Sequence, residues 1–156
     1  MTQVDFYILD DNSRRNIHQM VCHLCEKALS QKLNVLIYTR SEQQAHIIDE
    51  LIWTYKSVSF IPHCVLSSGF SPNSEEKNKI FNYPVVIQAS ASSDQVQIPE
   101  QYTCLLINLS LQTPFFHQRF QRIAEIVDKD ENEKQLARER YRFYRKQGYS
   151  LNKYDL

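Results

Sequence analysis

The sequence predicts an α/β protein with a mostly parallel sheet, helices on both faces and a long C-terminal helix. Short apolar, β-rich runs alternate with segments of helical periodicity, which is the pattern of β-α-β units. Two runs, at residues 34–39 and 103–109, are almost continuously apolar, as expected for strands covered on both faces. The chain has 156 residues, of which 42% are hydrophobic, enough for one core. We therefore expect residues 1–156 to form a single domain with a Rossmann-like or helicase-domain-like arrangement.

The first half of the chain supplies two pairs of a strand and a helix. Residues 4–9 (VDFYIL) are a short β-rich run, and the polar turn 10–15 separates them from a helix. The spacing predicts a core-facing stripe on that helix: Ile17, Met20, Val21, Leu24 and Ala28. The strand at 34–39 leads to a second helix, with Ser41 as N-cap and Gln44 completing a capping box. The inward stripe of the second helix is Ala45, Ile48, Leu51 and Ile52.

The second half is less regular. Residues 67–78 form a polar loop, and residues 84–89 and 103–109 are two further strand candidates. Thr113 and Pro114 indicate the N-cap and the first residue of a third helix. The predicted core stripe of this third helix is Phe116, Phe120, Ile123, Ala124 and Val127.

A long helix is predicted near the end of the chain. Asp130 and Glu133 indicate a capping pair at its start, and Gly148 suits the left-handed residue that ends a helix. At about 100° per residue, one helical face gathers positive charges around an aromatic ring, namely Lys134, Arg138, Tyr141, Arg142 and Arg145. We expect Leu136 and Phe143, on the opposite side, to be buried, so that the basic stripe faces solvent.

Composition restricts the partners and the compartment. The 18 basic and 18 acidic side chains give a formal net charge of zero, so the whole molecule does not attract nucleic acid electrostatically. Any binding driven by charge must be local. No apolar run approaches the roughly 18 residues of a membrane span, and residues 1–10 lack the features of a secretory signal. We therefore expect a cytoplasmic protein without membrane contact.

Glycine is too scarce for a phosphate-binding loop. The turn after the first strand, residues 10–16 (DDNSRRN), contains none, and neither G-x-G-x-x-G nor G-x-x-x-x-G-K-[ST] occurs. The candidates for a catalytic triad are Ser67, Ser68, His63 and Asp94. A triad is equally poorly supported, because neither serine lies in the sharp G-x-S-x-G turn that exposes a nucleophile. The sequence thus predicts no catalytic residues, no nucleotide and no cofactor.

A C-x-x-C pair, Cys22 and Cys25, lies inside the first predicted helix. A structural zinc site needs four converging ligands, usually from two separated pairs, and the other cysteines and histidines are scattered. A redox thiol would favour a helix N-terminus, where the dipole lowers its pKa. We therefore interpret both cysteines as small buried hydrophobes and expect no metal site. With Cys64 and Cys104 they form no disulfide framework, which fits the cytosol.

Trp53, the sole tryptophan, points roughly 130° away from the inward stripe of the second helix. One interpretation is an interface anchor that joins Phe60, Ile61, Pro62 and His63 in an apolar patch. The other is that the helix ends early and Trp53 folds back under the loop at 67–78. The pattern favours neither.

The basic stripe of the last helix also has two interpretations. A solvated basic face is the usual meaning of a charged helix. However, like charges repeat at spacings of three and four residues around Tyr141, and arginine is suited to bidentate carboxylate recognition. Such a stripe fits a short acidic peptide. Nucleic-acid phosphate could use the same residues, so the stripe alone does not choose between these ligands.

Three segments resemble the chi subunit of bacterial DNA polymerase III. They are DFYILD at residues 5–10, DELIWTYKSVSFIPH at 49–63 and KQLARERYRFYRKQGYSLN at 134–152. They occur in the family's order, and the C-terminal run is specific. The stretch at 65–98 carries no comparable match.

This resemblance implies a Rossmann-like, non-catalytic accessory subunit of DNA polymerase III, a DNA-directed DNA polymerase. Such a subunit pairs one-to-one with the psi subunit, which tethers it to the clamp-loader complex. Its other surface binds the acidic, phenylalanine-ended C-terminal tail of single-stranded DNA-binding protein. It thereby links the replication machinery to coated lagging-strand template, and its contact with nucleic acid is mainly indirect. Whether a DNA-repair helicase competes with psi is left open, and direct binding of single-stranded nucleic acid is the alternative function.

The resemblance also implies which residues bind each partner. The tail site comprises Val127, Lys134, Arg138, Tyr141 and Arg142. The psi site comprises Trp53, Phe60, Pro62 and His63. The family usually has lysine where Arg142 stands, and arginine keeps the charge but changes the hydrogen-bond geometry. We expect Arg140, on the far side of the helix, to be structural, and Arg145 to be peripheral.

Overall fold

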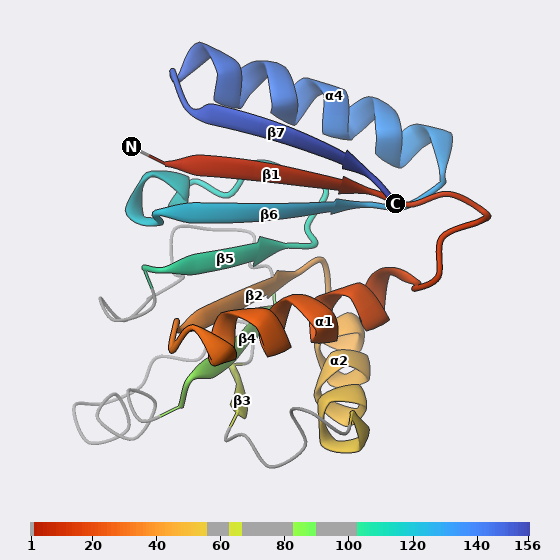
Figure 1. Cartoon of the computed structure of the whole chain (residues 1–156), viewed down its shortest axis with the longest axis vertical. Helices are drawn as coiled ribbons and strands as arrows, with labels where there is room; N and C mark the ends of the chain where they lie inside the picture. The colour runs from red at the N-terminus through yellow and green to blue at the C-terminus, as the bar shows by residue number, and fades with distance from the viewer. Residues whose placement is uncertain (1, 56–62, 67–82, 90–102) are drawn as a thin grey trace.

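The fold is built on one sheet of seven parallel strands (Figure 1). The computed structural model describes residues 2–55, 63–66, 83–89 and 103–156. The strand order is β3-β4-β2-β5-β6-β1-β7, with bounds β1 Gln3–Ile8, β2 Val35–Thr39, β3 His63–Leu66, β4 Val85–Ala89, β5 Leu105–Asn108, β6 Arg122–Val127 and β7 Ser150–Asp155. The described helices are α1 Ile17–Ser30, α2 Glu42–Thr54 and α4 Glu131–Lys146, with a 3₁₀ turn at His117–Arg119.

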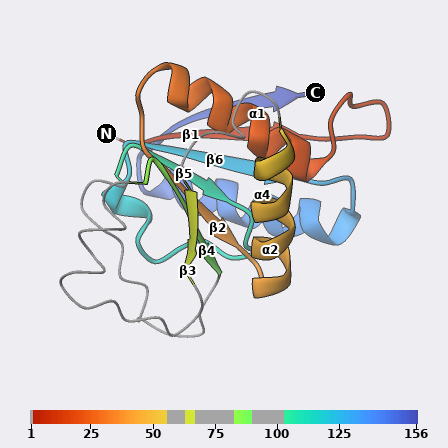
Figure 2. The ribbon, with the colours of Figure 1, turned by 90° about the horizontal axis from the view of Figure 1, so that it is seen from below.

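The sheet separates two hydrophobic cores, because successive strand residues point to opposite faces. In β2, Val35 and Ile37 pack with α1 and α2, whereas Leu36 and Tyr38 pack on the face covered by α4. Figure 2 shows α1 and α4 on opposite sides of the sheet. The predicted α/β class, parallel sheet and helices on both faces are therefore confirmed.

The predicted starts of α2 and α4 are right in position but differ in detail. The Ser41 side chain accepts a hydrogen bond from the Gln44 N–H at 3.1 Å, as an N-cap should. The Gln44 side chain, however, accepts from the Arg40 N–H at 3.0 Å and so does not complete the predicted box with Ser41. At the start of α4, Asp130 accepts from the Asn132 N–H at 2.8 Å. Its predicted partner Glu133 instead pairs with Arg40 at 2.7 Å.

The prediction of a third helix after Thr113 is wrong. The chain makes only the 3₁₀ turn at His117–Arg119 and then enters β6, which lies between β5 and β1. A strand buried on both faces has no amphipathic period, so its apolar residues also fit helical spacing. The predicted stripe is nevertheless fully buried, at Phe116, Phe120, Ile123, Ala124 and Val127.

Besides β6, two further strands were not predicted. β3 is only four residues long and begins at His63, and β7 covers residues near the end of the chain for which no element was predicted. Gly148, with φ of 81°, ends α4 in the left-handed conformation expected and reverses the chain so that β7 can pair with β1. β7 is largely exposed, so it carries little apolar signal.

The buried face of α4 differs from the one predicted. Leu136 is only partly buried and Phe143 is 37% exposed, whereas the buried residues are Ala137, Arg140 and Tyr144. The expectation that Leu136 and Phe143 face the core is therefore wrong. The expectation that Arg140 is structural is confirmed, because its side chain is buried against the sheet.

Arg140 is buried because Glu125 of β6 lies beneath it, with no exposed surface. The Glu125 carboxylate accepts hydrogen bonds from Arg140 Nε at 3.1 Å, Tyr144 Oη at 2.7 Å and Asn108 Nδ2 at 2.9 Å. Burial raises the pKa of Glu125, and the Arg140 charge and these donors oppose that shift. Arg140 also donates to the Leu111 carbonyl at 3.0 Å. This cluster, which we call the Glu125 cluster, fastens α4 to β5 and β6.

Removing the Glu125 carboxylate should destabilise the fold strongly. Glu125→Ala leaves the Arg140 charge buried without its partner, which costs about 3–5 kcal/mol. Urea unfolding would measure this loss, with the exposed Glu139→Ala on α4 as a control expected to lie within about 0.5 kcal/mol of wild type. A loss below about 1 kcal/mol for Glu125→Ala would show that the cluster does not fasten the helix.

Acidification should destabilise the protein through His117, with smaller contributions from two partly buried histidines. His117 is buried, its Nδ1 lies 2.7 Å from Tyr149 Oη, and burial lowers its pKa from 6.5. Below about pH 6.5 the unfolded chain therefore binds a proton that the folded protein excludes, so stability falls as pH falls. The pKa values of His18 and His23 are also lowered, mainly by desolvation. Thermal unfolding between about pH 7.5 and about pH 5.5 would measure the pH dependence of stability. His117→Gln should reduce this dependence, whereas His46→Gln, at an exposed position, should not. If the unfolding temperature of His117→Gln changed with pH as much as that of wild type, His117 would not have this role.

Candidate functional site

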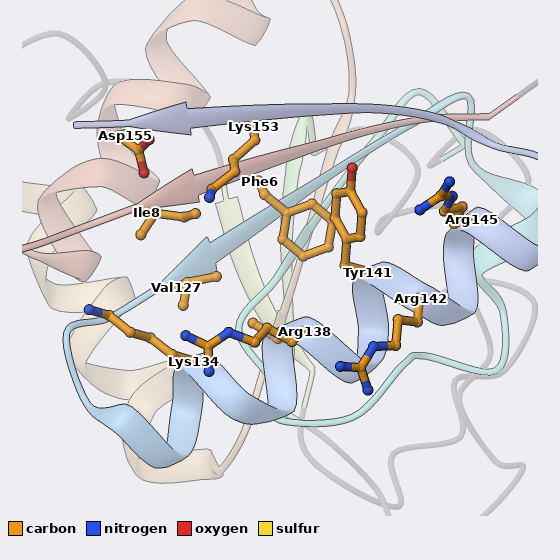
Figure 3. Close-up of a pocket in the computed structure, with 11 residues that line it drawn as sticks. Phe6, Ile8, Val127, Lys134, Arg138, Tyr141, Arg142, Arg145, Lys153 and Asp155 are labelled. Carbon is orange, nitrogen blue, oxygen red and sulfur yellow. The ribbon is translucent and has the colours of Figure 1, made fainter.

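A groove of about 630 Å³ opens between α4 and the carboxyl-terminal halves of β6, β1 and β7 (Figure 3). Its position follows from the fold, because the short turn at Gly148 holds the end of α4 beside the start of β7. The start of α4 lies close to the carboxyl end of β6, and β1 lies between β6 and β7. The helix therefore runs obliquely across the sheet, from the carboxyl end of β6 to the start of β7. At their carboxyl ends, β1 and β7 therefore form an open floor beside the helix.

The floor of the groove is apolar and aromatic. Phe6 and Ile8 of β1 and Val127 of β6 supply it, and Tyr141 of α4 covers its inner end (Figure 3). The Phe6 and Tyr141 rings are in tilted contact, with centroids 5.4 Å apart. This packing holds Tyr141 with its ring toward the floor. An apolar side chain of about the size of phenylalanine could be desolvated there.

The walls of the groove are positively charged. Four cations project from α4 and one from β7, against a single carboxylate, that of Asp155. The cations are Lys134, Arg138, Arg142, Arg145 and Lys153. Lys134 Nζ lies 3.9 Å from a Glu131 carboxylate oxygen, and Arg138 donates to Gln135 at 3.2 Å. Both contacts are local to α4 and exposed, so an incoming anion can replace them easily.

The structure brings all five residues of the implied tail site, Val127, Lys134, Arg138, Tyr141 and Arg142, to this one groove. Their role in binding stays a prediction. Arg145, expected to be peripheral, lines the same groove, as do Phe6, Ile8, Lys153 and Asp155, which the helical pattern could not identify. These residues lie on β1 and β7, and only the sheet order, with β7 beside β1, brings them to α4.

Trp53 lies near the end of α2 with 57% of its surface exposed. Because α2 continues to Thr54, the interpretation in which the helix ends early is wrong. The indole packs on His63, with ring centroids 4.5 Å apart, and His63 Nε2 lies 3.0 Å from an Asp49 carboxylate oxygen. We call Trp53 and His63 the Trp53 patch. Phe60 and Pro62, the other members of the implied psi site, lie outside the described residues.

The groove and the Trp53 patch lie toward opposite ends of the sheet. The groove borders β7, the last strand at one end, whereas His63 begins β3, the last strand at the other. Figure 1 shows α2 beside β3 and β4 and α4 beside β7. A ligand in the groove therefore leaves the Trp53 patch accessible.

The cysteine pair is buried, as predicted. Cys22 has no exposed surface and Cys25 is 1% exposed. Burial raises the pKa of Cys22 to about 11 and also raises the pKa of Cys25. Because the thiolate is the reactive form, neither thiol is poised for redox chemistry. Among the described helices, none combines the length and the apolar character that a membrane span requires.

Comparison with known proteins identifies the family. The model of the family described as DNA polymerase III chi subunit, HolC, matches residues 1–152. The subunit chi of Pseudomonas aeruginosa DNA polymerase III is 33% identical over 156 residues, covering 100% of this chain and 98% of that protein. Those of Haemophilus influenzae and Escherichia coli are 33% and 31% identical, covering 94% and 97% of this chain and 92% and 97% of those proteins. The chain therefore belongs to the DNA polymerase III chi subunit family, whose members are accessory subunits in DNA replication.

Proposed function

We propose that this protein is a non-catalytic, cytoplasmic adaptor of the clamp-loader complex. Its groove binds the acidic, phenylalanine-ended C-terminal tail of single-stranded DNA-binding protein, and its Trp53 patch binds psi in a one-to-one pair. The adaptor thereby links the polymerase to coated lagging-strand template. One observation carries the proposal: the groove combines five cations with an apolar floor, as an anionic peptide with one apolar end requires.

The chemistry of the groove suits both parts of such a tail. The terminal phenylalanine side chain packs on Phe6 and Val127 beside Tyr141, where burial contributes about 1.5–3 kcal/mol. The terminal carboxylate and neighbouring aspartates pair with Lys134 and Arg138. Charge-assisted hydrogen bonds contribute about 1.5–3 kcal/mol where they are shielded and much less where they are exposed. Together these contacts support micromolar binding, or about 8 kcal/mol, which suits a reversible link.

Direct binding of single-stranded nucleic acid is the competing function. The same cations could hold phosphates and Tyr141 could stack on a base. Two features favour the peptide: the net charge of the chain is zero, and Asp155 places a carboxylate in the groove. A nucleic-acid strand carries a phosphate at every nucleotide and would place one beside that carboxylate, whereas a peptide can place an uncharged residue there.

The Trp53 patch suits a protein partner. An exposed tryptophan held against a buried histidine offers a large, rigid apolar surface, and tryptophan is enriched among residues that dominate binding energy. Psi bound there would connect the chain to the clamp loader while leaving the groove open. A DNA-repair helicase that used the same patch would compete with psi and would not compete with the tail.

Arg138→Ala removes one cation that pairs with a carboxylate of the tail peptide. Because the energy of such a pair lies between that of an exposed and that of a shielded ion pair, the substitution should weaken binding of the peptide about 5- to 30-fold. Fluorescence anisotropy with a labelled acidic peptide ending in phenylalanine would measure this change. Lys146→Ala is the matched control, because Lys146 is an exposed cation on α4 outside the groove. Its affinity should equal that of wild type.

Added salt should weaken the wild-type complex, because part of its affinity is electrostatic. Undiminished affinity in Arg138→Ala, or insensitivity to salt, would contradict the tail site. Binding of a single-stranded oligonucleotide as tight as that of the peptide would instead favour the nucleic-acid function.

Trp53→Ala should weaken the pairing with psi about 30-fold or more, the usual effect of truncating a central interface tryptophan. Co-purification with psi, followed by calorimetric titration, would measure it. Ile47→Ala is the control, since Ile47 is another exposed apolar residue of α2. Tail binding should be unchanged in both variants. Equal psi affinity for Trp53→Ala and wild type would exclude the patch as the psi site.

A further inference from the structure

The outer edge of β7 offers unpaired backbone groups. β7 is the last strand of the sheet and pairs on one side only, with β1. The Ser150 N–H donates to the Thr2 carbonyl at 3.2 Å, and the Leu156 N–H donates to the Ile8 carbonyl at 3.0 Å. Every second residue of a strand directs its backbone groups to the same neighbour, so the intervening residues direct theirs outward. These are Leu151, Lys153 and Asp155, and no described residue pairs with them as a strand.

The side chains of Leu151, Lys153 and Asp155 lie on the face of the sheet that α4 covers, where the groove is. Lys153 and Asp155 line it (Figure 3), and Leu151 packs against the core beneath α4. The residues between them face the other side of the sheet. Asn152 donates to an Asp5 carboxylate oxygen at 3.0 Å, and the Tyr154 ring stacks on another tyrosine at a centroid distance of 5.3 Å. The open backbone edge and the cationic groove therefore share one rim.

An open strand edge is a template for another extended chain, and edge charges restrict which chain can pair. Lys153 attracts an acidic strand, and Asp155 limits the positions at which a second acid can lie. The arginines of α4 attract the same anionic chain from the opposite wall. Peptides that add a strand gain affinity from main-chain hydrogen bonds and specificity from alternate side chains. An acidic peptide anchored on the groove floor is thus already beside a suitable edge.

We propose that the acidic tail binds as one further strand on the outer edge of β7. Its main chain exchanges hydrogen bonds with the outward backbone groups of Lys153 and Asp155, while its terminal phenylalanine occupies the groove floor. This proposal rests on the tail-binding function above. It makes Lys153 a further binding residue, through its ammonium group and its backbone N–H together.

Two substitutions separate the contributions of Lys153. Lys153→Ala removes the charge and keeps the backbone N–H, whereas Lys153→Pro removes both. Proline is tolerated on an edge strand where its nitrogen faces outward, and the preceding Asn152 is already extended. With the labelled acidic peptide, Lys153→Pro should bind about fivefold more weakly than Lys153→Ala, the effect of one lost hydrogen bond. If Lys153→Ala and Lys153→Pro have the same unfolding temperature and bind the peptide with equal affinity, the proposal is wrong.

A second measurement uses the wild-type protein and so does not depend on the folding of a variant. Peptides are methylated at single backbone nitrogens, position by position. If the peptide adds a strand, methylation at every second nitrogen should weaken binding by about tenfold, because the methyl group blocks the edge, and methylation between them should change little. Equal effects at adjacent positions would overturn the strand geometry.

The two proposals fail in different ways. If unmodified peptide binds and Arg138→Ala weakens it, but methylation shows no alternation, tail binding stands and strand addition is wrong. If unmodified peptide does not bind to the wild-type protein, the tail-binding function fails, and strand addition fails with it.

Discussion

The buried pairing of Glu125 with Arg140 determines where α4 lies, and the groove depends on that position. Glu125 comes from the middle of the sheet and Arg140 from the helix, and both are almost fully buried. A charge in that position tolerates little displacement, because an unpaired buried charge is very unfavourable. The same helix turns Arg138 and Tyr141 toward β1 and β7. The constraint that stabilises the fold therefore also positions the groove.

Helical period predicted part of the fold and part of the groove. The α1 stripe and the basic stripe follow from helical period alone, whereas the pattern left open whether Trp53 is exposed. The prediction was wrong at β6, because burial on both faces removes the amphipathic period that distinguishes a strand from a helix. It was also wrong about the buried face of α4, where Arg140 is buried and Phe143 is not. The contribution of β7 depended on its pairing with β1, a contact between the two ends of the chain that local patterns do not encode.

The proposed linking function does not require a protein with net charge. In the part of the chain that the structure describes, one groove gathers cations from α4 and β7 around an apolar floor. A uniformly basic protein would bind nucleic acid broadly, whereas a local site combined with a floor for one apolar side chain would favour a short acidic terminus. The Trp53 patch, at the other end of the sheet, allows a second partner to bind independently.

The most direct test of tail binding in the groove is a titration of the ¹⁵N-labelled protein with the acidic, phenylalanine-ended peptide, followed by backbone amide chemical shifts. If the peptide binds in the groove, saturable changes should occur in α4 around Arg138 and Tyr141 and at the carboxyl ends of β1 and β7, with none at Trp53. Changes centred on Trp53 or on α1, or no saturable change at millimolar peptide, would contradict binding in the groove.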